Sequence, residues 1–283
     1  MATGAPPDVP TNVPPERRAL AARARDLLEA HHAARPLLLA NAWDVASARA
    51  VEEAGLGFVA TSSRAVAAVL GEPDDDSSDP DLVFSFLSRI VRAVSVPVTA
   101  DLQAGLRLRP AELVERLAEA GAVGCNLEDS DHHGAGDLVP AEQQAAYLAE
   151  VRSAADESGT HVVVNARTDA FVRLPRDAPR LEEAVRRGSL YFEAGADCVY
   201  PMLVERKEDV VALVASLPGP LNFLARRGGL SLAELAGLGA SRISLASGLF
   251  HLLHDRLVEI LGTLGRGGDG AAGFDLVSAP GQE

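Results

Sequence analysis

The chain has 283 residues, of which 47% are hydrophobic but only 4% aromatic, and its formal net charge is −14. This length suits a single α/β barrel with an aliphatic core, whereas the acidic balance argues against nucleic acid and anionic membrane surfaces as partners. No apolar run of about 18 residues could span a bilayer, and the amino terminus lacks the apolar segment of a signal peptide, so we expect a cytoplasmic protein.

The two ends of the chain differ in composition from its middle. Residues 1–15 are rich in proline and polar side chains, which predicts a disordered lead. Residues 265–283 are rich in glycine, which predicts a flexible tail. Residues 16–264 are expected to form one domain.

Short apolar runs alternate with amphipathic segments in this domain. The runs predict strands at 36–40, 58–62, 96–101, 123–128, 161–167, 198–202, 221–225 and 242–246. The amphipathic segments predict helices at 45–54, 84–94, 110–120, 141–157, 181–194, 208–216, 231–238 and 249–264. The phrases EAGLGFVA, EAGAVGCN, EAGADCVY and GLGASRIS each place a glycine where a helix ends and the next apolar run begins.

Repeated units of strand, loop and helix without hairpin signatures indicate parallel strands joined by right-handed crossovers. Eight such units predict a (β/α)₈ TIM barrel. An open doubly wound sheet is disfavoured, because the chain lacks a Gly-x-Gly-x-x-Gly loop after the first strand. In such a barrel the active-site side chains lie at the carboxyl ends of the strands.

Acidic side chains gather at these strand ends. Asp101 ends the third strand and Glu128 the fourth, and we expect them at equivalent depth on neighbouring strands. Two carboxylates so close repel each other unless a proton or a cation neutralises them. Oxygen ligands without Cys or His partners favour Mg²⁺ or Mn²⁺. The adjacent Asp129 is either a supporting partner of this site or a surface cap.

Arg167 ends the fifth strand and has two interpretations. Its guanidinium can bind a substrate carboxylate, or it can neutralise Glu128 in an ion pair. With a metal, the arginine would bind a small anionic keto acid and stabilise an enolate. Asn222, just inside the seventh strand, is a further candidate for substrate binding.

Other reactive side chains narrow the chemistry. The one lysine, Lys207, lies in a charged stretch expected to begin a helix, which disfavours imine chemistry. Cys125 and Cys198 lie in apolar runs and are expected to be buried thiols. His132 and His133 follow the fourth strand; we expect them to be solvated, with an acid–base role as the alternative.

The sequence resembles the isocitrate lyase/phosphoenolpyruvate mutase superfamily. The resemblance is carried, in order, by NAWDVASAR, GFVATSS, LGEPD, VPVTADLQAG, AGAVGCNLEDS, VVNARTDAF, EAGADCVYPM and PLNFLA. It implies a phosphoenolpyruvate/pyruvate-type barrel that uses Mg²⁺ to make or break C–C or P–C bonds in α-oxo or enol carboxylates. It also implies a homo-oligomer, dimer or tetramer, in which the last helix is exchanged between subunits.

The resemblance further implies roles for individual residues. Asp101 matches the direct metal ligand, and Glu128 and Asp74 match acids that hold metal-bound waters. The resemblance also implies that the catalytic residues are Arg167, Ser62, Ser63 and Glu128. The expected substrate-binding residues are Trp43, Asp44, Ser62, Ser63, Arg167 and Asn222.

The chain departs from the superfamily pattern at three places. Gln103 stands where a second acid usually follows the metal ligand, which predicts a weaker or altered metal site. The loop at 131–136 lacks the Lys-x-Cys-Gly of the lyase branch, so the chain is not expected to be a true isocitrate lyase. Gly105-Leu106-Arg107 replaces a usual Gly-Tyr-Gly, with a consequence that the sequence does not define.

The expected activity is cleavage or formation of a bond in an oxaloacetate-like or phosphonopyruvate-like substrate, through a metal-stabilised pyruvate enolate. The alternative is a barrel of the same superfamily that binds ligand without turnover, which Gln103 and the missing cysteine loop favour. A third alternative is a metal-dependent pyruvate aldolase, for which no histidine base is evident. Either enzyme would take a small anionic carboxylate.

Overall fold

The computed structural model describes residues 15–134 and 138–265. The expected disordered lead and flexible tail lie outside these residues, except that Pro15 begins the first helix and Gly265 ends the last. No helix in the described ranges is long and apolar enough to cross a membrane.

The strands form two parallel sheets, with the orders β1-β9-β8 and β2-β3-β4-β5-β6-β7. Their bounds are β1 (Leu37–Leu39), β2 (Asn41–Ala42), β3 (Val59–Thr61), β4 (Val98–Asp101), β5 (Gly124–Glu128), β6 (Val163–Thr168), β7 (Cys198–Pro201), β8 (Asn222–Leu224) and β9 (Arg242–Ser244). Ala40 alone separates β1 from β2. At the other junction, a single parallel bridge joins Val199 of β7 to Leu221 before β8.

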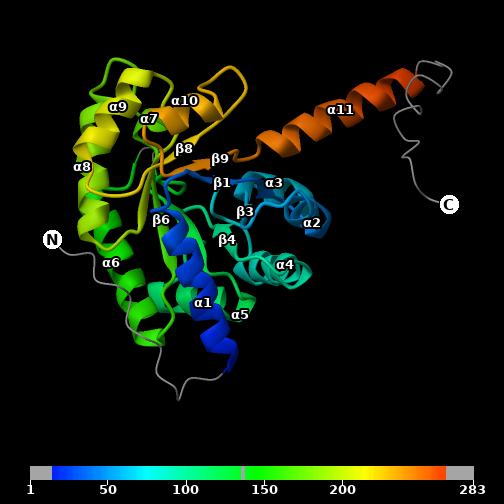
Figure 1. The fold of residues 1–283 in the computed structure, drawn as a ribbon, viewed down its shortest axis with the longest axis horizontal. Coiled ribbons are helices and arrows are strands. Elements are labelled where there is room, and N and C mark those ends of the chain that lie inside the picture. Colours follow the sequence, from blue (N-terminus) through cyan, green and yellow to red (C-terminus); the bar gives the residue numbers. More distant parts are fainter. Residues whose placement is uncertain (1–14, 135–137, 266–283) are drawn as a thin grey trace.

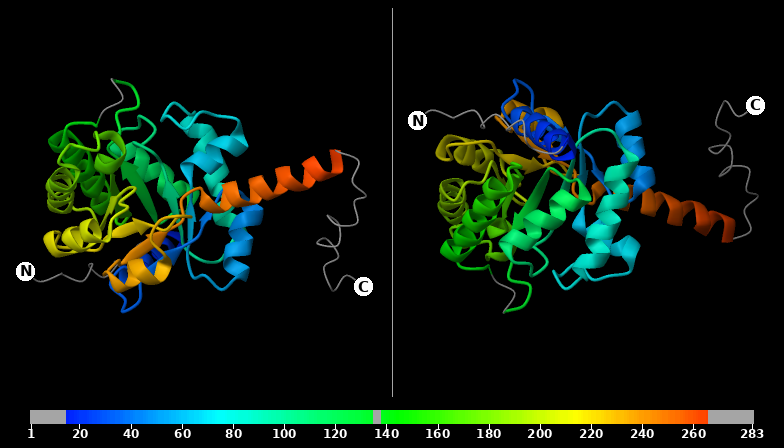
Figure 2. Two further views of the ribbon diagram at one scale, coloured as in Figure 1. Left: turned by 90° about the horizontal axis from the view of Figure 1, so that it is seen from above. Right: turned by 90° about the horizontal axis from the view of Figure 1, so that it is seen from below.

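The strands therefore follow one another in chain order, with β1 and β2 sharing one position. The helices lie outside the strands (Figures 1 and 2). Each predicted strand has its counterpart in the structure, and the predicted (β/α)₈ class is confirmed. The first strand was expected to be continuous, but it changes partners at Ala40: its first half pairs with β9 and its second half with β3.

The helices connect these strands. Their bounds are α1 (Pro15–Ala30), α2 (Val45–Glu53), α3 (Ser63–Leu70), α4 (Pro80–Ala93), α5 (Pro110–Ala120), α6 (Ala141–Ser158), α7 (Ala170–Arg173), α8 (Arg180–Glu193), α9 (Lys207–Ser216), α10 (Leu232–Gly237) and α11 (Gly248–Gly265). The glycines of the four repeated phrases, Gly55, Gly121, Gly195 and Gly239, all have positive φ, between 80° and 97°. A side chain would strain that backbone conformation, so glycine ends each of these helices as expected.

Helices α1, α3 and α7 are additional to the predicted elements. Helix α1 buries Ala24 and Leu27 in a cluster with Leu39, Val123 and Val163. Val123 directly precedes β5 and Val163 begins β6, so α1 covers the amino end of the barrel. This end is opposite to the predicted site.

Helix α11 projects away from the rest of the molecule in all three ribbon views (Figures 1 and 2). Five of its apolar side chains are more than half exposed: Leu252, Leu253, Leu257, Val258 and Leu261. The base of the helix is fixed by Phe250, whose ring meets Trp43 edge-on at a centroid distance of 5.4 Å.

Candidate active site

A cleft of about 430 Å³ opens at the carboxyl ends of the strands. It brings together six of the predicted site residues: Ser62, Ser63, Asp74, Asp101, Glu128 and Arg167. They come from the ends of β3, β4, β5 and β6 and from the segment that follows α3. This is the position at which α/β barrels place their chemistry.

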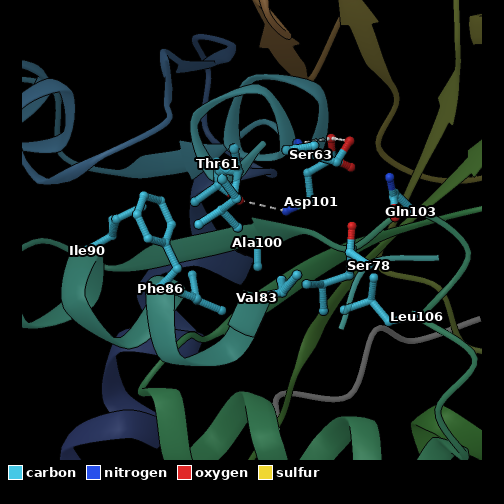
Figure 3. A pocket seen from close by; sticks show the side chains of 15 residues that line it. Thr61, Ser63, Ser78, Val83, Phe86, Ile90, Ala100, Asp101, Gln103 and Leu106 are labelled. Atoms are coloured by element: carbon cyan, nitrogen blue, oxygen red, sulfur yellow. Dashed lines mark hydrogen bonds between the residues drawn. The ribbon is translucent and has the colours of Figure 1, made fainter. Parts of the chain in front are cut away.

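Asp101 is held by hydrogen bonds from three sides. Its Oδ2 accepts bonds from the backbone N–H and the hydroxyl of Ser63, at 2.9 and 2.8 Å. Its Oδ1 accepts a longer bond of 3.3 Å from the amide of Asn126, and its backbone N–H donates to the hydroxyl of Thr61. Figure 3 shows Ser63 and Asp101 pointing toward one another above a small, mostly apolar cavity of about 30 Å³. The carboxylate orientation is therefore set by protein donors.

Glu128 is buried and both of its carboxylate oxygens are engaged. Oε2 lies 2.6 Å from Nη1 of Arg167, and Oε1 lies 2.6 Å from Nε2 of His132. Burial raises the pKa of the Glu128 carboxyl, against the opposing effects of Arg167 and His132. The hydrogen bond to Glu128 in turn raises the pKa of His132. The structure therefore contains the ion pair between Arg167 and Glu128 that was one of the two interpretations of Arg167.

Arg167 is also bound to a second acid. Its Nε and Nη2 donate to the two oxygens of Asp169, at 2.7 and 2.8 Å. Burial lowers the pKa of Arg167, but Glu128 and Asp169 more than offset this and raise it well above its ordinary value. All three guanidinium nitrogens therefore have carboxylate partners, and the fork is fixed in one plane.

Asp129 supports this arrangement from below. It is fully buried and accepts hydrogen bonds from the backbone N–H of Asp169 (2.8 Å), the hydroxyl of Tyr191 (2.6 Å) and Nη1 of Arg187 (3.0 Å). The surface interpretation of Asp129 is therefore wrong. Helix α8 supplies Arg187 and Tyr191, and so connects to the site through Asp129 and Asp169.

The register corrects one expectation about the acids. Asp101 pairs with Asn126, whereas Glu128 pairs with Arg167. Glu128 therefore lies two residues further along the barrel than the neighbour of Asp101, because the strands of a barrel are staggered. The two acids still line the same cleft.

Three predicted residues lie outside the lining of this cleft. Asp44 caps α2, where its Oδ1 accepts a 2.7 Å bond from the N–H of Ser47. Trp43 contacts Phe250 at the base of α11. Asn222 is completely buried, and neither polar atom of its side chain has a hydrogen-bond partner in the described part of the chain. Their roles in substrate binding stay predictions.

The cleft also contains residues that the sequence did not single out, namely Arg64, Asp169, Arg173, Arg226 and His251. Asp169 could have been found from its place two residues after Arg167, on the same face of an extended segment. Arg173 lies on the one-turn helix α7, which is too short to leave a periodic signal.

The two histidines after β5 differ from each other. The side chain of His132 is only 9% exposed, so the expectation that it is solvated is wrong; its bond to Glu128 draws it into the cleft. The side chain of His133 is 49% exposed, as expected. Lys207 begins α9 and is also exposed, as predicted.

The candidate metal ligands are the carboxylate oxygens of Asp101, Glu128 and Asp74, which line the same cleft. No group of three or more His, Cys, Asp or Glu side chains in residues 15–134 and 138–265 is arranged to hold a metal ion. Mg²⁺ is commonly held by only one or two carboxylates and keeps several waters. The donor set of Asp101, with Glu128 and Asp74 around the same cleft, fits such a water-rich centre.

The two cysteines do not take part in this site. Cys125 and Cys198 are completely buried, as predicted. Burial raises the pKa of each thiol to about 12. Neither side chain can provide a thiolate at neutral pH.

Comparisons with known proteins agree on one family. The family model described as phosphoenolpyruvate phosphomutase matches residues 27–264. A solved structure from Burkholderia cenocepacia J2315, provisionally named a phosphonomutase, is 35% identical, covers 86% of this chain and 99% of its own, and has a TM-score of 0.80. The 2-methylisocitrate lyase of Bacillus subtilis (strain 168) is 28% identical and aligns with 71% of this chain and 66% of its own.

A more distant structure shares the fold. Oxaloacetate acetylhydrolase, solved in complex with the inhibitor 3,3-difluorooxalacetate, has a TM-score of 0.76 at 22% identity. The match covers 87% of this chain and 86% of that one.

Proposed function

Because the chain belongs to the phosphoenolpyruvate phosphomutase family, within the isocitrate lyase/phosphoenolpyruvate mutase superfamily of enzymes, we propose that it makes or breaks a C–C or P–C bond in a small α-oxo carboxylate. The observation that carries the proposal is the shared cleft of Asp101, Glu128, Arg167 and the Ser62–Ser63 turn. Oxaloacetate-like and phosphonopyruvate-like acids are the proposed substrates, reacting through a pyruvate-type enolate.

We propose Mg²⁺ or Mn²⁺ as the cofactor. Asp101 would hold the ion directly, with Glu128 and Asp74 acting through waters. The bound cation supplies positive charge that stabilises an enolate. The two Ser63 donors hold the Asp101 carboxylate in a fixed orientation toward the cleft.

The protein residues divide the remaining work. Arg167 would orient the substrate carboxylate with Nη1, whose present partner is Glu128, while Asp169 keeps the other two nitrogens in place. The hydroxyl of Ser62 lies at the start of α3 and lines the same cleft, beside the proposed oxo-acid end. His132 would serve as an acid–base group, because its Nε2 shares a 2.6 Å hydrogen bond with Glu128 within the cleft.

The absence of a cysteine from residues 129–140 separates this chemistry from isocitrate lyase. Cys125 precedes the strand end and is buried, so it cannot replace a catalytic thiol. A related function without that thiol is therefore favoured.

A second candidate is a ligand-binding barrel without turnover. Two observations favour it: Gln103 stands in place of an acid, and both oxygens of Glu128 already have partners. The retained Asp101, with an open cleft in front of it, favours the enzyme.

Thermal unfolding with Mg²⁺ and oxalate, an enolate mimic, tests the proposed metal–enolate site. The enzyme is expected to melt several degrees higher with both additions. Asp101→Ala should abolish the shift, whereas the control Asp75→Ala, which removes an exposed acid from the segment after α3, should keep it. No shift in the wild type would count against the metal–enolate site. Pyruvate release from a panel of oxo and phosphono acids then separates the enzyme, which turns over, from the binding barrel, which does not.

We also propose that the protein is a homo-oligomer through α11. The exposed leucines of this projecting helix form an apolar surface that a second copy of the chain would cover (Figure 1).

A further inference from the structure

Four arginine side chains line the cleft among the described residues: Arg64, Arg167, Arg173 and Arg226. Three of them are neutralised by carboxylates. Arg64 lies 3.3 Å from Asp74, Arg167 is bound to Glu128 and Asp169, and Arg226 is bound to Glu205. These three cations therefore have protein partners for their charge.

Arg173 differs from the other three. Its Nε donates a 3.0 Å hydrogen bond to the hydroxyl of Ser130, and no carboxylate in residues 15–134 or 138–265 lies within ion-pair distance of it. Ser130 is buried, and its hydroxyl donates in turn to Asp169 Oδ2 at 2.5 Å. One neutral hydroxyl thus fixes the guanidinium while leaving its positive charge uncompensated.

The attachment to Asp169 gives Arg173 a defined place relative to Arg167. Asp169 binds Nε and Nη2 of Arg167 directly and reaches Arg173 through Ser130. Asp169 therefore fixes both guanidinium groups, and both line the cleft that contains Asp101. A guanidinium binds carboxylate or phosphonate oxygens in a fork geometry and remains charged throughout the working pH range.

We propose that Arg173 binds the second acidic group of the substrate, the carboxylate or phosphonate carried on the third carbon. This inference rests on the proposed function, in which Asp101 and Arg167 serve the oxo-carboxylate end. Arg173 then selects dianionic oxo acids over substrates whose far end is neutral. It is a specificity-determining residue, and the bond that breaks lies between the two anchored ends.

Binding measurements by calorimetry on the full chain with Mg²⁺ test this assignment. Oxalate is the probe for the enolate end alone. 3,3-Difluorooxaloacetate adds a far carboxylate, and phosphonopyruvate adds a far phosphonate. Arg173→Gln is expected to weaken the two larger ligands at least about tenfold, the loss of one charge-assisted bond, and to leave oxalate within about twofold.

Arg176→Gln is the matched control. It removes the same charge just after α7, but the side chain of Arg176 is 85% exposed and lines a different cleft. All three affinities should be unchanged in this variant. A similar loss of affinity in Arg176→Gln would show that any nearby positive charge has the same effect as Arg173. This result would overturn the inference.

The remaining outcomes separate the inference from the proposed function. If the wild type binds oxalate and Arg173→Gln weakens all three ligands equally, or none of them, the assignment of Arg173 is wrong while the metal–enolate site stands. If the wild type binds none of the three, the proposed function fails and the inference fails with it. A loss for the carboxylate alone or the phosphonate alone supports the inference and identifies the far group.

Discussion

The side-chain amide of Gln103 donates a 2.7 Å hydrogen bond to Oδ1 of Asp74. The carbonyl oxygen of the same amide accepts a 3.0 Å bond from the backbone N–H of Asp76. Gln103 is buried and itself has a positive φ of 55°. The amide therefore ties the segment after α3 to the end of β4, a task that an acid at this position could perform only with a cation or proton nearby.

Gln103→Glu is expected to lower the free energy of unfolding by about 1–3 kcal/mol without Mg²⁺, because a second carboxylate then faces Asp74. Mg²⁺ should restore more stability in this variant than in the wild type. Urea denaturation with and without Mg²⁺ measures both effects. The surface control Gln143→Glu should change neither, and a Gln103→Glu variant as stable as wild type without metal would contradict the account.

Arg187→Met is expected to destabilise the fold by about 3–5 kcal/mol, because it leaves the fully buried Asp129 without its cation. Chemical denaturation measures the loss. The neighbouring Arg186 has ion pairs at the surface, so Arg186→Met should cost no more than about 1 kcal/mol. Equal losses in the two variants would show that Asp129 does not depend on Arg187.

His31 predicts a stability change with pH. Burial, followed by the charge of Arg242, lowers the pKa of His31 from 6.5 to about 4. Its Nδ1–H donates to the carbonyl of Leu27, and Nε2 accepts from Arg242, as only the neutral ring can. Between pH 6.5 and 4, His31 is therefore protonated in the unfolded chain but neutral in the folded chain. This contribution to stability is complete above pH 6.5 and is lost as the pH falls toward 4.

His31→Gln removes that proton linkage. The stability difference between wild type and variant should shrink by roughly 3 kcal/mol from pH 7 to pH 4. Urea titrations at several pH values measure it. Ala149→Gln, at an exposed position on α6, adds no ionisable group and should show a constant difference. A constant difference for His31→Gln as well would mean that the buried ring is protonated in the folded state.

Leu257→Asp is expected to shift the protein to a smaller assembly, because it places a charge within the apolar surface of α11. Light scattering after size-exclusion chromatography measures the mass. Ala149→Asp, on an exposed position of α6, serves as the control. If the wild type is itself a monomer at micromolar concentration, α11 is not an interface.

The barrel was predictable from sequence because its signals are local. Glycines such as Gly121 and Gly195 mark helix ends directly, and the apolar runs after them mark the strands. Helix α1 escaped prediction because its buried face is built largely from alanines, such as Ala24, among many arginines. The α1 segment differs little in hydropathy from a polar lead.

The candidate site was predictable as a set of residues but not as a set of contacts. The strand ends identified Asp101, Glu128 and Arg167, and the cleft contains all three. The partners of each side chain depend on strand stagger, which no single segment encodes. The bond between His132 and Glu128 and the uncompensated charge of Arg173 became visible only once the loops were placed.

Helix α11 starts at the cleft itself. Gly248 and His251 line the cleft, while Phe250 contacts Trp43 and the leucines further along face outward. In the proposed assembly, a neighbouring copy would cover the far end of this helix while its first turn lines the cleft, so assembly would be coupled to catalysis. Specific activity is then expected to fall when the protein is diluted and the copies separate.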